Sequence, residues 1–206
     1  MFAYIMDELK KHIHFTIFGA VTGVIIAFFL RNVINTDAYY TIFYIFHPIH
    51  VVLSALVTSS LYKSYNSNYL KNTSSFWILL IIGYFGSIGI ATLSDSFIPY
   101  LGEYLLDLPN REIHLGFIEK WWLINPLAVL GIIIAYYKPA TKFPHSGHVL
   151  LSTWASLFHI LMAIGNKISF LSYIIIFIFL FIAVWIPCCL SDIIFPMLVI
   201  IEKERY

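Results

Sequence analysis

Two histidines three residues apart, His47 and His50, stand inside an apolar stretch of this chain. Imidazoles at positions i and i+3 lie on one face of a helix, where both can reach a common ion. The eight-residue pattern from His47 to Ser54 returns 98 positions later, from His145 to Ser152. A single histidine at a helix end is more often an interfacial side chain. The recurrence of the whole pattern instead favours metal binding.

A second echo places one carboxylate in each half of the chain. Asp95 and Asp192 are both preceded by Leu-Ser and followed four positions later by proline. Because the two echoes share nearly the same offset, we interpret the chain as an internal duplication. Repeat 1 covers about residues 12–107 and repeat 2 about residues 112–201.

The composition is that of a membrane protein. Of 206 residues, 60% are hydrophobic and 11% are charged, and the mean hydropathy is +0.85. An ordinary soluble domain has about 25% charged residues. The net charge of +1 gives no reason to expect a nucleic-acid partner. The sequence therefore predicts an all-α integral membrane protein, residues 1–206 forming a single polytopic domain in a lipid bilayer.

Long apolar runs predict six transmembrane helices. Their approximate ranges are 14–30, 40–62, 76–95, 121–137, 145–165 and a run that starts near 168. We expect the third helix to break at Asp95 and an interfacial helix to follow it, with Glu103 on its solvated face. A similar surface helix is expected after the sixth run. A repeat of three crossings must insert its two copies in opposite orientations, which is the inverted-repeat architecture of secondary transporters.

The lysines and arginines predict the orientation, because cytoplasmic segments carry more of them. An arrangement with both termini cytoplasmic places eight of the twelve on the inside, which favours a plasma or inner membrane protein with N and C termini inside. The inside set is Lys10, Lys11, Lys63, Lys71, Lys138, Lys142, Lys203 and Arg205; the outside set is Arg31, Arg111, Lys120 and Lys167.

Repeat and topology together predict two metal sites near opposite membrane faces, each with three histidines and one aspartate. The first set is His47, His50, Asp95 and His114; the second is His145, His148, Asp192 and His14. On this prediction His47 and His50 do not meet His145 and His148. Serines and threonines at helical spacing continue each set inward, although such hydroxyls more often bond neighbouring helices. His159 has no repeat partner and is interpreted as a packing residue or as one that supports the ligands from behind.

The donor types restrict the cofactor. Imidazole with carboxylate suits a divalent transition metal, with zinc, iron or manganese favoured, while soft copper(I) prefers thiolate. Haem is not expected, because His47 and His50 share one helix face. No nucleotide-binding fingerprint is present, so no nucleotide is expected. The two cysteines are adjacent and do not form a disulfide framework.

Three functions are compatible with these patterns. The inverted repeat with two symmetric clusters favours a carrier for divalent transition-metal ions. A membrane-embedded metal-dependent hydrolase or oxidoreductase, acting on a lipid or other apolar substrate, is the main alternative, so whether the chain is an enzyme stays open. A purely structural metal is the third. No catalytic residue is assigned, and a homo-oligomer is compatible with the sequence.

Overall fold

The computed structural model describes residues 2–30, 36–65, 75–164 and 169–189. Every regular element in these ranges is a helix, which confirms the predicted all-α class. In chain order they are α1 (Phe2–Leu30), α2 (Thr36–Tyr65), α3 (Ser75–Thr92), the π-helical turn η2 (Leu93–Phe97), α4 (Ile98–Leu105), α5 (Gly116–Glu119), α6 (Trp121–Tyr137), α7 (Lys142–Ala163) and α8 (Phe170–Cys189).

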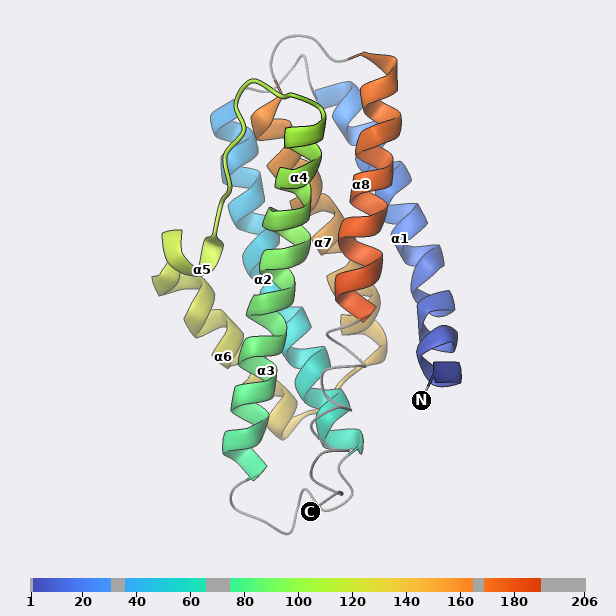
Figure 1. Ribbon diagram of the computed structural model, residues 1–206. Helices are drawn as coiled ribbons and strands as arrows, with labels where there is room; N and C mark the ends of the chain where they lie inside the picture. The colour runs from blue at the N-terminus through green and yellow to red at the C-terminus, as the bar shows by residue number, and fades with distance from the viewer. Residues whose placement is uncertain (1, 31–35, 66–74, 165–168, 190–206) are drawn as a thin grey trace.

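Successive long helices run in opposite directions (Figure 1). Helix α1 rises from the N-terminal end and α2 descends beside the core. Helices α3 and α4, joined by η2, rise again, and residues 106–115 then turn back down to α5 and α6. Helix α7 rises and α8 descends. We call the end at which α4 stops the upper side and the opposite end the lower side.

The third helix does not end where the sequence predicted. The amide of Ile98 donates to the carbonyl of Leu93, an i to i+5 bond that defines a π turn, and the chain stays helical through it. Pro99 is tolerated because it lies in the first turn of α4, where its missing N–H is not needed. The predicted break at Asp95 and the separate interfacial helix after it are therefore wrong.

Four helical segments in the described ranges are long and apolar enough to cross a membrane: Ile13–Leu30, Thr36–Ser64, Phe76–Leu105 and Phe170–Cys188. Helix α6, Trp121–Tyr137, is apolar but shorter. Helix α7 is not among them, because it carries the second histidine pattern and several hydroxyl groups. Several helices are thus long and apolar enough to span a membrane, which indicates a helical membrane protein. The surface helix predicted after the sixth run lies outside the described residues.

Helices α2 and α7 form the centre of the bundle. In the α2 span 56% of residues are buried, against 28% in the α1 and α8 spans, which face outward. The two central helices pack against each other, and α2 also packs against α3 and α6. Their buried surface is polar, which is why hydropathy alone does not identify α7. Its buried polar side chains are His47, His50, Ser54, Thr58, Ser59 and Ser60 on α2 and His148, Ser152, Thr153, Ser156 and His159 on α7.

Helix α6 provides a scale for depth. Exposed Trp121 and Trp122 stand at its upper end and exposed Tyr136 and Tyr137 at its lower end, as in the aromatic belts of membrane proteins. At 1.5 Å per residue, its 17 residues extend roughly 25 Å. That length is close to the ~30 Å hydrocarbon core.

Ser60 lies level with the lower end of α6, since its hydroxyl accepts a hydrogen bond from the Ala140 amide at 3.1 Å. His50 stands ten residues above Ser60 on the same helix. The rise of an α-helix makes that separation roughly 15 Å. His50 is therefore near the middle of the depth that α6 marks.

Candidate functional site

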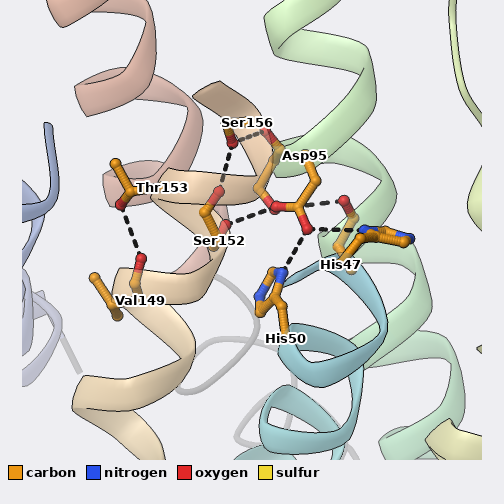
Figure 2. A network of polar contacts seen from close by, with 9 residues as sticks. His47, His50, Asp95, Val149, Ser152, Thr153 and Ser156 are labelled. Carbon is orange, nitrogen blue, oxygen red and sulfur yellow. Dashed lines mark hydrogen bonds and ion pairs between the residues drawn. The ribbon is translucent and has the colours of Figure 1, made fainter. Parts of the chain in front are cut away.

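Asp95 is fully buried and accepts four hydrogen bonds (Figure 2). The Nδ1 atoms of His47 and His50 lie 2.8 and 2.7 Å from its Oδ2 atom. The hydroxyls of Ser94 and Ser152 donate to its Oδ1 atom, each at 2.7 Å. An ionised carboxylate offers about four lone-pair positions, so this one is saturated. The predicted association of His47, His50 and Asp95 is confirmed.

The second histidine pattern meets the first. The ring of His148 stacks on that of His50, with centroids 5.9 Å apart and planes 8° apart. His145 stands edge-on to His148 at 5.3 Å. The prediction that the two histidine pairs stay apart is therefore wrong. Because α2 and α7 run antiparallel at the centre of the bundle, equivalent positions of the two copies face each other.

Local structure explains why these side chains converge. His47 and His50 are three residues apart and share one face of α2, and Pro48 between them removes an N–H from the helix ladder. Asp95 sits in the π turn, a feature that is frequent at functional sites. Unlike an α-helical turn, this turn contains one extra residue.

The His47 ring is held on two sides. Phe43 stacks on it, with centroids 5.1 Å apart and planes 12° apart. At the edge of the ring, a Cβ atom added at Gly116 would stand 2.5 Å from the His47 Nε2 atom. Only glycine at the start of α5 permits this close approach, so α5 is positioned against the site.

Helix α7 anchors the carboxylate through two serines (Figure 2). The Ser152 hydroxyl bonds Asp95, and the Ser156 hydroxyl donates to the carbonyls of both Ser94 and Ser152 at 2.8 Å. These contacts join the second half of the chain directly to the π turn of the first. The sequence marked both serines as part of a polar stripe but gave no sign that they serve the carboxylate of the other half.

His114 is not beside Asp95. Its Nδ1 atom lies 3.3 Å from Glu119 Oε2, and its backbone amide donates to the Nε2 atom of His159 at 3.3 Å. The prediction that it joins the Asp95 group is therefore wrong. The reason is the descending segment 106–115, which carries His114 to α7 rather than to η2.

Glu103 is the residue that sequence reasoning misplaced most. It is fully buried, and its Oε1 atom lies 2.6 Å from Nδ1 of the buried His159. The predicted solvated position of Glu103 is wrong. His159, which the sequence suggested as a packing or supporting residue, contacts this buried acid. Two features of the sequence could have predicted this pair. Glu103 follows Asp95 on the same stretch of helix, and His159 continues the row of polar residues along α7.

The second predicted metal set is only partly described. His145 and His148 lie as given above, His14 is exposed on α1, and Asp192 lies outside the described residues. His14 therefore stands on an outward-facing position rather than in the buried polar centre.

The nitrogen and oxygen donors around Asp95 are of the kind that binds a transition metal, but the distances between them are too short for an ion to be held. Within the described ranges, no three His, Cys, Asp or Glu side chains are arranged to hold a metal ion. The two Nδ1 atoms stand at hydrogen-bond distance from Oδ2, whereas ligands of tetrahedral zinc lie about 3.3 Å apart. Exchange of the two ring protons for one ion thus requires these separations to grow by about half an ångström.

No protein-family model, curated protein or solved structure matches this chain. What can be argued about its function therefore comes from its own fold and from the buried histidine-aspartate centre.

Proposed function

We propose that this protein is a carrier for divalent transition-metal ions, with one central binding region formed by both halves of the chain. The observation that carries the proposal is the convergence of both histidine patterns at mid-depth around one buried carboxylate. His47 and His50 contact Asp95, and His148 stacks on His50. Ionisable side chains in a membrane are costly and mark ion pathways.

The donors suggest how an ion would be held. Asp95 with the two α2 imidazoles offers one oxygen and two nitrogens, and His148 brings a third imidazole from α7. Bound metal would replace ring protons, so binding would release protons to solvent. Zinc, iron and manganese suit this donor set.

The architecture supports a carrier rather than a static site. Transporter sites lie near the bilayer midplane at the interface of inverted repeats, on helices that are interrupted there. The π turn at Asp95 is a local irregularity in a continuous helix at this depth. The proposal includes six crossings in two inverted repeats and both termini on the cytoplasmic side of a plasma or inner membrane. It also includes a second half-site that would involve Asp192.

Uptake of Zn²⁺ or Mn²⁺ into proteoliposomes tests the carrier. Wild-type protein should load a metal-reporting dye inside the vesicles, and Asp95→Asn should reduce loading to the level of protein-free vesicles. Asp107→Asn is a matched control, because Asp107 is an exposed aspartate paired with Arg111. An absence of metal-dependent flux in wild-type vesicles contradicts the proposal.

A membrane-embedded enzyme is the second candidate, and one observation favours it. Asp95 holds the Nδ1 side of His50, while the buried Nε2 atom has no hydrogen-bond partner among the described residues. A histidine oriented by a carboxylate in this way can act as a general base. Hydrolysis of ester-containing lipids by purified protein, lost in His50→Gln, would support the enzyme over the carrier.

A further inference from the structure

A second buried acid-histidine pair lies above the Asp95 centre and is not used by the proposed metal site. Glu103 and His159 are 0% and 1% exposed, on α4 and α7. Glu103 stands eight residues beyond Asp95 on a continuous helix, a rise of roughly 12 Å. Glu103 lies within the candidate membrane span Phe76–Leu105, where an ionisable side chain indicates function by default.

The hydrogen bonds define the protonation of His159. Its Nε2 atom accepts the His114 amide, so the ring hydrogen is on Nδ1 and points at Glu103 Oε1. The other carboxyl oxygen, Oε2, is buried with no hydrogen-bond partner among the described residues. A proton can therefore bind to and leave Oε2 without disturbing the contact to His159.

A chain of polar groups leads from this pair to Glu119 at the end of α5, where the side chain is partly exposed. His114 contacts His159 ring to ring at 5.4 Å and contacts Glu119, whose side chain is 33% exposed. Tyr44 donates to Glu119 at 2.6 Å. The other ionisable groups close enough to act on the pair are Arg111 on Glu103, and Asp95 and His47 on His159.

An aromatic ring separates this pair from the metal centre. Phe43 is fully buried and stacks on His47 on one side. It also contacts His159 at 5.6 Å and His114 at 6.2 Å between ring centroids. The two networks are thus neighbours that do not share a ligand.

We propose that Glu103 is the proton-binding site that couples proton movement to metal transport. The Oε2 atom takes up one proton that enters past Glu119 and His114, which gives a carboxylic acid. In the other half of the transport cycle this acid releases the proton to the opposite side of the membrane and becomes a carboxylate again. His159 holds the carboxyl group, and His114 with Glu119 forms the access route. The inference rests on the proposed carrier function and adds its coupling ion.

The test measures metal and protons separately in proteoliposomes that contain a pH-sensitive dye. Wild-type protein exposed to Zn²⁺ should change the internal pH continuously, and Glu103→Gln should reduce this change to the single release of protons that accompanies metal binding. The variant should bind Zn²⁺ with a Kd within about twofold of wild type, because sites this far apart are nearly independent. Asp107→Asn should keep both properties. A full pH change in Glu103→Gln overturns the coupling.

Wild-type vesicles that carry no metal would overturn the carrier. In that case infrared spectroscopy still tests whether Glu103 binds a proton. The carbonyl band of a protonated carboxyl group is followed through a pH titration of purified protein. A titrating band that Glu103→Gln removes supports Glu103 as a proton site. The absence of such a band from the wild-type minus variant difference overturns it.

Discussion

The two copies of the histidine pattern have nearly the same sequence and different surroundings. In α2, both histidines bond Asp95, whereas in α7 His148 stacks on His50 and His145 is only half-buried. The serine that ends each copy also differs. Ser152 donates to Asp95, but the equivalent Ser54 has no hydrogen-bond partner among the described residues. The comparison teaches that the copies act on each other, with the second helping to hold the acid of the first.

The largest loss of stability is expected on substitution of Asp95, the acid that residues of both α2 and α7 contact. Asp95→Ala removes the acceptor of four donors and should lower the free energy of unfolding by about 3–5 kcal/mol, the usual result of breaking a buried charged network. Thermal unfolding in detergent measures the loss. Asp107→Asn should unfold like wild type, and equal stability of Asp95→Ala would contradict a saturated carboxylate.

Metal content decides whether the copies form one site or two. If they share one region, His50→Ala and His148→Ala should each remove the bound metal entirely, because each deletes a ligand of the same ion. Elemental analysis of purified protein measures this, with exposed His14→Ala as the control. Two ions bound to wild type and one ion bound to each variant would instead support the original prediction of two separate metal sites.

The paired serines provide an intermediate test. Ser152→Ala removes a hydrogen bond to a carboxylate and should destabilise by about 1.5–3 kcal/mol. Ser54→Ala removes a buried hydroxyl that has no hydrogen-bond partner in the described part of the chain, and it should be nearly neutral. Chemical denaturation of the two variants makes the comparison. Equal losses would mean that the copies are equivalent after all.

The smallest loss of stability is expected at Gly116, which leaves space for the His47 ring. Gly116→Ala places a methyl group against the ring and should cost about 1–3 kcal/mol through overpacking, with weaker metal binding. Gly89→Ala is the matched control, because a Cβ atom there meets open space. Calorimetric Kd values for Zn²⁺ check this, and an unchanged Kd for Gly116→Ala would show that the His47 orientation does not matter.

The helical class and the group around Asp95 could be predicted because both depend on local signals. Apolar runs report helices in a bilayer, and the spacing of His47 and His50 places both on one face. The repeat also marked Asp95 as the acid that belongs with them. These inferences need only periodicity and the high cost of burying polar groups.

The relative placement of the helices could not be predicted in this way. Two helices that carry the same sequence pattern can lie apart or in contact, and the tertiary packing of α2 against α7 decides between the two arrangements. His114 and Glu103 were misplaced for a related reason. Charged residues at the end of an apolar run usually face water, and nothing local indicated that segment 106–115 descends and that His159 meets Glu103.

The π turn decides which way the acids face. Eight residues separate Asp95 and Glu103, and in an unbroken α-helix they would point about 80° apart. The extra residue in Leu93–Phe97 reduces the effective separation to seven steps, which brings the two side chains to within about 20° of each other. The turn therefore acts as a phase shift in the helix. An unbroken α-helix of the same length would not present both acids to α7 at the same time.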